Sequence, residues 1–192
     1  MEITRLILPF LGTREYLHGT TLFDALASFA PPDAELSIKF SQMIRTNCVA
    51  LNPADGAAAD ATFAWKGSGD SGVIHICPLL PVTPLERRPY PEPLVAGQVK
   101  VEAKRARYSA ESPFSFVATL VPLHKTLLAH NHVAEGPGQW VFTRLDLKAR
   151  PTTFRSIELE LSGVFGSLAR SSIRVEDEPL GFIYFSWLPP QS

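Results

Sequence analysis

Residues 14–26 read REYLHGTTLFDAL and place a histidine, a glycine, two threonines and an aspartate within seven positions. The preceding residues 2–10, EITRLILPF, are mostly apolar and predict a strand. The following residues 20–30, TTLFDALASFA, predict a helix that ends before Pro31 and Pro32. The polar stretch therefore marks the point where the first strand gives way to the first helix. It is open to two interpretations, a loop with an acid/base pair or a capped helix start.

The capping interpretation rests on the spacing of Thr21 and Asp24. Thr21 as the N-cap and Asp24 three residues later fit a capping box. In that motif the N-cap side chain accepts from the backbone N–H of the third helical residue, whose own side chain turns back to the N-cap N–H. A carboxylate in the first turn is also stabilised by the helix dipole. On this interpretation Asp24 is structural and His18 is an exposed turn residue.

The rest of the first half predicts strands. Alternating apolar residues indicate one strand over 35–51, followed by a turn-rich stretch at 52–60. Two further strands, 61–67 and 72–80, are separated by GSGDSG, which is typical of a hairpin.

The second half predicts a similar series. A strand over 97–108 precedes a helix over 112–131, in which Ser112 and Pro113 fit an N-cap and first-turn pair and Pro122 predicts a kink or break. Strands are then expected at 139–150, 154–165, 167–177 and 181–188.

The two halves follow one order, in which a strand and a helix precede several antiparallel strands. Residues 72–81 (GVIHICPLLP) match 181–190 (GFIYFSWLPP), and Tyr16 with Thr20 matches Tyr108 with Ser112. We infer an internal duplication from their shared order. Residues 1–80 form the first repeat, residues 81–93 a proline-rich linker, and residues 94–192 the second repeat.

A helix that follows one strand and is wrapped by an antiparallel sheet resembles the hotdog fold, and tandem copies resemble a double hotdog. The resemblance covers nearly the whole chain and is topological. It implies an α+β fold with an antiparallel sheet wrapped around two buried helices. Both predicted helices are apolar on most sides and need such cover, as Leu22, Phe23 and Leu26 illustrate for the first. The alternative is a single β-barrel or sandwich that carries two helices.

The resemblance also implies a chemistry, because hotdog enzymes act on acyl thioesters of coenzyme A or acyl carrier protein. In dehydratases of this kind a loop histidine takes the proton beside the carbonyl and a helix acid protonates the leaving hydroxyl. His18 and Asp24 are the catalytic candidates on this basis, and 3-hydroxyacyl dehydration or thioester hydrolysis is the expected reaction. Gly19 allows close approach of the thioester to the backbone, and Thr20 lies beside it.

The second half has no histidine that matches His18. A complete site would therefore combine His18 or Asp24 with groups from the second half. Glu111 and His124 are the candidates for substrate binding, together with Lys125. No cofactor and no metal site is expected; His130 and His132 lack a third ligand and fit a polar helix end.

Composition bears on the other classes of function that this protein could have. The net charge is −1, and the one basic cluster, KRAR at 104–107, is too short to indicate nucleic acid binding. No apolar run reaches the length of a membrane span, and Cys48 and Cys77 are expected to be free thiols in a reducing cytoplasm. Two alternatives to an enzyme remain: a non-catalytic hotdog that binds an acyl chain or a partner, and a structural subunit, including a homo-oligomer, that pairs through edges such as 181–188.

Overall fold

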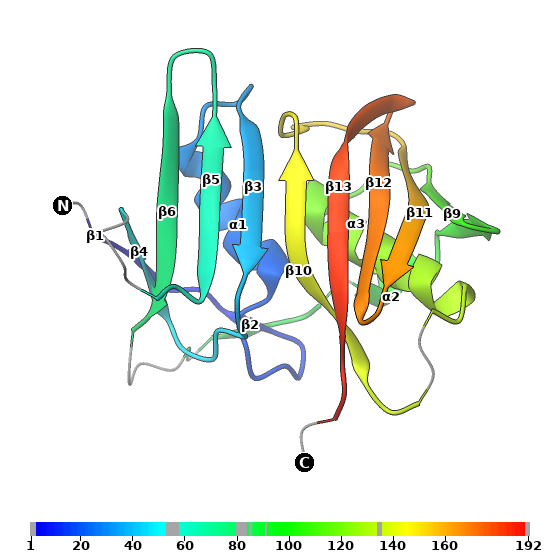
Figure 1. Ribbon diagram of the computed structural model, residues 1–192, viewed down its shortest axis with the longest axis horizontal. Helices are drawn as coiled ribbons and strands as arrows, with labels where there is room; N and C mark the ends of the chain where they lie inside the picture. The colour runs from blue at the N-terminus through cyan, green and yellow to red at the C-terminus, as the bar shows by residue number, and fades with distance from the viewer. Residues whose placement is uncertain are drawn as a thin grey trace. The chain divides into compact units, whose positions relative to one another are not determined.

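The computed structural model describes residues 3–52, 58–79, 84, 86–90, 92–133 and 136–190. The chain divides into two compact units, Met1–Tyr90 with Lys148–Arg150, and Pro91–Leu147 with Pro151–Ser192 (Figure 1). The division after Tyr90 falls within 81–93, the predicted linker, of which 81–83, 85 and 91 lie outside the described residues. Each unit is built on its own stretch of antiparallel sheet.

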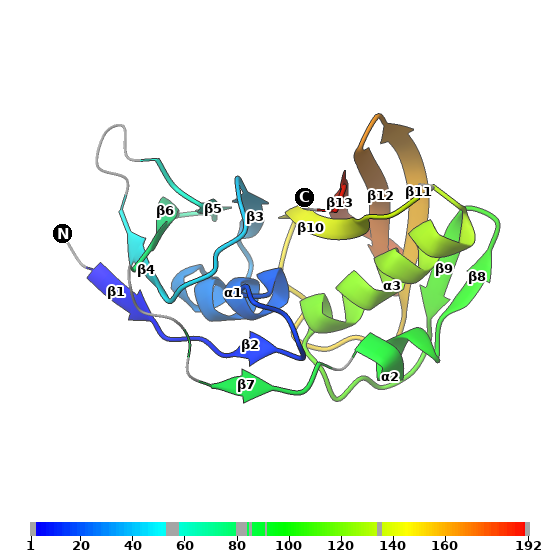
Figure 2. The ribbon, with the colours of Figure 1, turned by 90° about the horizontal axis from the view of Figure 1, so that it is seen from below.

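In the first unit five strands pair in the order β1-β4-β6-β5-β3, all antiparallel. Their bounds are Ile3–Leu6, Cys48–Leu51, Ser71–Pro78, Ala61–Lys66 and Glu35–Phe40, in that order. Helix α1, Gly19–Leu26, continues as a 3-10 turn over Ala27–Phe29 and lies on one face of this sheet (Figure 2). The ring of Phe23 meets the edge of Phe63 at 6.2 Å, which joins the helix to the sheet in a shared core.

The β5–β6 hairpin predicted around GSGDSG is confirmed, with Lys66 opposite Ser71. The single strand predicted over 35–51 is wrong. It is two strands, β3 and β4, which pair with β5 and β6 respectively and not with each other. The alternation misleads because Ile44, in the connecting loop, is also buried. The turn-rich stretch at 52–60 lies largely outside the described residues, which resume at 58.

In the second unit six strands pair in the order β10-β13-β12-β11-β9-β8, again all antiparallel. Their bounds are Gln139–Leu147, Glu178–Leu188, Leu168–Val175, Ile157–Phe165, Arg105–Tyr108 and Lys100–Glu102. Helix α3, Phe116–His130, lies along one face of this sheet, with the short helix α2, Glu92–Ala96, beside it (Figure 2). Ten of the fifteen residues of α3 are buried, so the helix is covered on most sides.

Two expectations for this unit, the single strand at 97–108 and a break at Pro122, are wrong, and one short helix was not expected. The strand predicted over 97–108 is a hairpin, β8–β9, whose turn holds Ala103 at a φ of 50°. Helix α2 has no clear sequence signal, because Pro93 interrupts its five residues. Helix α3 runs through Pro122 without a break. Burial on most sides stabilises α3 enough to offset the backbone hydrogen bond that Pro122 cannot donate.

The strand orders of the two units can be compared along the chain. In each unit a strand that precedes the main helix, β1 or β9, lies at or next to one end of the strand order, and the strand after that helix, β3 or β10, lies at the other end. The last two strands exchange places: β6 lies between β4 and β5, whereas β13 lies between β10 and β12. The matched segments 72–81 and 181–190 therefore fall on strands at different positions in their sheets.

A two-residue parallel ladder holds the chain that leads into α1. Strand β2, Phe10–Leu11, pairs with β7, Arg87–Arg88. The Arg87 guanidinium also donates to the carbonyl oxygens of Gly12 and Arg14, at 2.7 and 2.8 Å. Part of the proline-rich stretch thus fixes the loop before the helix (Figure 2).

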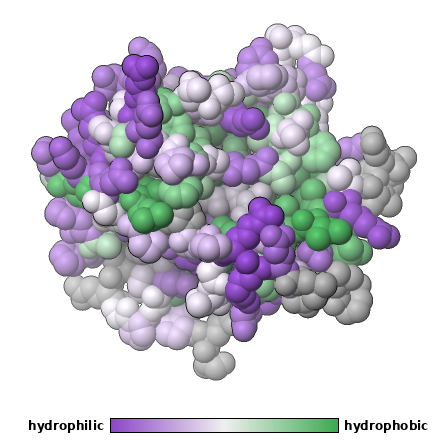
Figure 3. Space-filling model, turned by 180° about the vertical axis from the view of Figure 1, so that it is seen from behind, coloured by the Kyte–Doolittle hydropathy of each residue, from purple (hydrophilic) through white to green (hydrophobic). Residues whose placement is uncertain are grey.

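No helix among the described residues is long and apolar enough to cross a membrane. On the face shown in Figure 3, apolar residues lie in patches separated by polar ones. The most exposed large apolar side chains are Ile7, Leu94 and Phe165, which lie far apart in the sequence.

Candidate functional site

The N-cap residue of α1 does not cap the helix with its own side chain. His18 is the N-cap residue, with φ −73° and ψ 135°, and its side chain makes no capping hydrogen bond. The first helical bond runs from the Leu22 N–H to the His18 carbonyl at 3.1 Å, and the first turn holds no acidic residue. The capping box of Thr21 and Asp24 is therefore wrong, because the helix begins at Gly19, before both.

The side chain of His18 is held inside the first unit and is only 4% exposed. Its Nδ1 lies 2.8 Å from the Oγ1 of Thr20, which is itself 2% exposed. The Tyr90 ring packs against the imidazole with centroids 4.6 Å apart, and the Arg14 guanidinium lies 4.3 Å from the centre of the Tyr90 ring. A hydroxyl contact and an aromatic contact thus orient the imidazole at the start of the helix.

This arrangement can polarise a carbonyl group. The N–H groups of the first turn of a helix have no intrahelical partner and carry a partial positive charge. The N-cap residue His18 adds a buried imidazole, in an environment where electrostatic interactions are stronger than in water. The mouth of α1 therefore has the elements of a site for a carbonyl oxygen that gains negative charge.

The structure brings together three of the four site residues predicted from the first half and separates the fourth. His18, Gly19 and Thr20 lie together at the mouth of α1. Asp24 lies in the second turn, on an exposed face, and not in the first turn as expected. Its carboxylate therefore stands where water can reach it.

The mouth of α3 is different, because a side chain closes it. Ser115 is the N-cap, and its Oγ accepts from the Ala118 N–H at 3.2 Å. The cap and first-turn pair expected at Ser112 and Pro113 is wrong. The Ser112 hydroxyl instead accepts from the Phe114 N–H at 3.2 Å and lies 2.7 Å from the Thr119 hydroxyl. It thus forms a turn before the helix.

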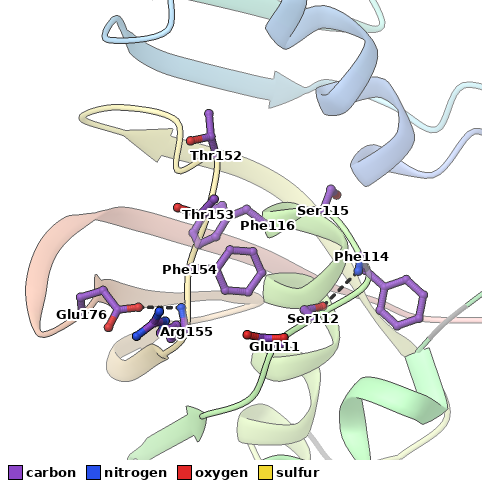
Figure 4. Close-up of a pocket in the computed structure, with 10 residues that line it drawn as sticks. All are labelled: Glu111, Ser112, Phe114, Ser115, Phe116, Thr152, Thr153, Phe154, Arg155 and Glu176. Atoms are coloured by element: carbon purple, nitrogen blue, oxygen red, sulfur yellow. Dashed lines mark hydrogen bonds between the residues drawn. The ribbon is translucent and has the colours of Figure 1, made fainter.

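A pocket of about 760 Å³ opens in the second unit at this helix mouth (Figure 4). Phe116 and Phe154 meet edge to face at 5.6 Å and form an apolar wall. The Glu176 carboxylate accepts from the backbone N–H groups of Arg155 and Ser156, at 2.6 and 3.0 Å, and these bonds lower its pKa. The remaining lining residues are Glu111, Ser112, Phe114, Ser115, Thr152 and Thr153. Glu111, expected to bind substrate, thus lies at this pocket.

His124 lies in the core of the second unit. Its side chain is fully buried, with Nε2 2.9 Å from the Ser171 Oγ and the ring edge to face with Phe185 at 4.6 Å. Burial lowers the pKa of His124 to about 3, so the imidazole is neutral near pH 7. The adjacent Lys125 pairs with Glu92 of α2 at 3.0 Å. These contacts fit packing between α2, α3 and the sheet.

Sequence reasoning did not identify Tyr90 or the loop at 152–155. Tyr90 lies in the proline-rich stretch, and nothing in its sequence context indicates a contact with a histidine 72 positions earlier. Among the described residues, no group of three or more His, Cys, Asp or Glu side chains could hold a metal ion. Cys48 and Cys77 are free thiols, and Cys48 is buried.

No family model matches the chain, and no curated protein sequence matches it. Solved structures do. The TesB protein of Mycobacterium avium subsp. paratuberculosis superposes with a TM-score of 0.50 at 12% identity, over 97% of this chain and 92% of that one. An acyl-ACP thioesterase from Bacteroides thetaiotaomicron gives 0.49 at 9% identity, over 97% and 96%. The dehydratase domain of MlnD from Bacillus amyloliquefaciens gives 0.46 at 9% identity, over 94% and 87%.

Identities this low bear on the fold and not on the activity. The match to the TesB protein extends over almost all of both chains. Antiparallel sheet with few helices fits a hotdog fold. The chain has a hotdog-like fold.

Proposed function

We propose that this protein handles acyl thioesters of coenzyme A or acyl carrier protein, with its site at the mouth of α1. The observation that carries the proposal is the N-terminus of α1, where the N-cap residue His18 makes no capping bond with its side chain and is buried against Thr20. The substrate class follows from the resemblance to hotdog enzymes, which act on such thioesters. The thioester carbonyl would lie at the first turn, where the helix N–H groups and His18 polarise it.

We assign the remaining residues from their places in their own units. Gly19 has no side chain to keep a thioester from the backbone, and Thr20 orients His18. Asp24, exposed on the same helix, is the proposed acid that protonates a leaving group. Glu111 is a proposed substrate-binding residue of the second unit, while the buried position of His124 favours a packing role.

We also propose that the two units descend from one duplicated plan. The shared position of the strands before and after each main helix supports this. The exchanged places of the last two strands then mark a rearrangement in one unit.

The experiment is a panel of acyl-CoA and acyl-ACP substrates tested with the wild type, His18→Ala and Asp24→Asn. Hydrolysis releases a free thiol, and dehydration of a 3-hydroxyacyl group creates a conjugated thioester with its own ultraviolet absorbance. We expect one of these products with the wild type and a large loss with His18→Ala. His130→Ala, an exposed change in the last turn of α3, is the matched control. Unchanged turnover in both site variants would refute the assignment.

A second candidate function is acyl-chain binding without turnover. It is favoured by the mouth of α3, which is capped by Ser115, has no histidine and opens on a pocket walled by phenylalanines. Thermal stabilisation by acyl-CoA without release of thiol or loss of water would support it. Loss of that stabilisation in Phe154→Ala, but not in His18→Ala, would place the ligand in the second unit.

A further inference from the structure

The hairpin turn between β12 and β13 has a backbone conformation that its residue types disfavour. Val175 pairs with Glu178 across the two strands, so Glu176 and Asp177 form a two-residue turn. Both have a positive φ, 49° and 66°, as in the type I′ turn, where asparagine and glycine are the usual residues. A glutamate at a positive φ is strained, because its Cβ crowds the backbone. Strain that is retained at such a place points to a role for the side chain.

The Glu176 side chain bonds a loop that lies 20 residues earlier in the chain. Its Oε1 accepts from the backbone N–H groups of Arg155 and Ser156, at 2.6 and 3.0 Å. The Glu176 N–H donates in return to the Ser156 carbonyl oxygen at 3.4 Å. Residues 151–156 lie between β10 and β11 and belong to neither strand. The turn residue Glu176 therefore holds this loop at its last two positions before β11.

The loop that Glu176 holds forms one wall of the pocket at the mouth of α3, where residues 152–155 line it (Figure 4). Phe154 directly precedes Arg155, whose N–H bonds Glu176. The Phe154 ring meets Phe116 of α3 edge to face, with centroids 5.6 Å apart. The bonds of Glu176 thus fix the chain next to Phe154 and, through it, the place of this ring beside the helix.

We propose that Glu176 is a positioning residue of this pocket, which holds the loop where Phe154 and Phe116 receive an acyl chain. Phenyl rings suit an alkyl chain, because their contact removes apolar surface of both from water. On this account the strained turn serves the ligand site and not the stability of the fold. The acyl-chain ligand rests on the second candidate function proposed above, whereas the hold on the loop rests on the bonds of Glu176.

The test separates stability from binding. Glu176→Asn suits a positive φ better, but its side chain is shorter by one CH₂ group and leaves the loop amides. We expect its unfolding free energy in urea to equal or exceed that of the wild type. Its Arg155 and Ser156 amides should exchange with solvent about tenfold faster. Its affinity for palmitoyl-CoA, followed by the NMR shifts of these two amides, should fall about tenfold.

Two further variants complete the comparison. Glu176→Gln keeps an acceptor oxygen at the same reach and should restore most of the slow exchange and of the affinity. Asp177→Asn changes the other residue of the turn, is the matched control, and should keep the wild-type exchange and affinity. If Glu176→Asn fails to fold, Glu176→Gly replaces it, because glycine adopts a positive φ without strain.

Wild-type exchange and affinity in Glu176→Asn would overturn the proposal. Stability, slow exchange and affinity that all fall together would also overturn it, since a turn residue with a structural role alone behaves in that way. Palmitoyl-CoA that leaves the Arg155 and Ser156 amides of the wild type unmoved would refute the acyl-chain pocket and with it the positioning role. Binding at these amides that Glu176→Asn leaves intact would refute only this inference.

Discussion

The buried pair of His124 and Ser171 makes the stability of the second unit dependent on pH. The folded pKa of His124 is about 3, against an ordinary value of 6.5 for an unfolded chain, and desolvation by burial is the cause. Because the folded pKa is depressed, the unfolded state binds a proton more readily below pH 6.5. The contribution of neutral His124 is therefore complete above pH 6.5 and is lost progressively as the pH falls toward about 3.

The magnitude follows from linkage. One extra proton on the unfolded state changes the folding equilibrium about tenfold per pH unit, so two units below the unfolded pKa cost about 3 kcal/mol. The reference is a double variant, His124→Leu with Ser171→Ala, which removes both polar partners and so leaves no unpaired buried group. Carboxylates titrate in both proteins, and their effect cancels in the difference.

The assay is urea unfolding at a series of pH values for the wild type and the double variant. The unfolding free energy of the wild type minus that of the double variant should be constant above pH 6.5. Below pH 6.5 this difference should fall by about 1 kcal/mol or somewhat more per pH unit. Parallel curves across the whole range would refute the reasoning. They would mean that His124 is protonated as easily inside the protein as outside it.

Three further predictions concern the fold around the site. Ser115→Ala should lower the unfolding free energy by about 1 kcal/mol in urea unfolding, because it removes the cap of α3, and Ser115→Asn should recover most of it; equal stability of Ser115→Ala and wild type would refute the cap. Gly181→Ala should prevent folding or lower the unfolding free energy by several kcal/mol, because the new Cβ would overlap the Asp146 carbonyl. The control Gly69→Ala places its Cβ where nothing lies within 4 Å, and its unfolding free energy should match the wild type within about 0.5 kcal/mol. A folded Gly181→Ala of wild-type stability would contradict this packing. Burial raises the pKa of the Cys48 thiol to about 12, so Cys48 should react with a thiol reagent only on unfolding. Cys77 is partly exposed and should react first in the native protein. Labelling of Cys48 in the native protein would contradict its burial.

The sequence predicts the parts of the fold that local chemistry controls. The β5–β6 hairpin follows from GSGDSG between two apolar runs, and the course of α3 follows from its apolar residues. The strand over 35–51 could not be divided correctly from sequence, because a buried loop residue such as Ile44 gives the same alternation as a strand residue. Pro122 predicted a break that burial on most sides of α3 prevents.

The sequence predicts which neighbouring residues form the candidate site, but not which distant residues contact them. The run His18, Gly19 and Thr20 is recognisable as a helix mouth, but the helix begins earlier than capping preferences suggest, because His18 itself takes the extended N-cap conformation. The contact with Tyr90 depends on the β2–β7 ladder, which pairs segments more than seventy residues apart. No local pattern encodes such a pairing, since its register is set by tertiary packing.

The central claim is that an acyl thioester lies at the mouth of α1 beside His18. A crystal structure with an acyl-CoA analogue whose thioester is replaced by an amide tests it most directly, because the amide keeps the carbonyl and resists hydrolysis. We predict that the carbonyl oxygen lies within about 3 Å, hydrogen-bond distance, of the first-turn N–H groups of α1 and beside the His18 imidazole. An analogue bound only in the pocket at α3, or with its carbonyl away from His18, would contradict the account.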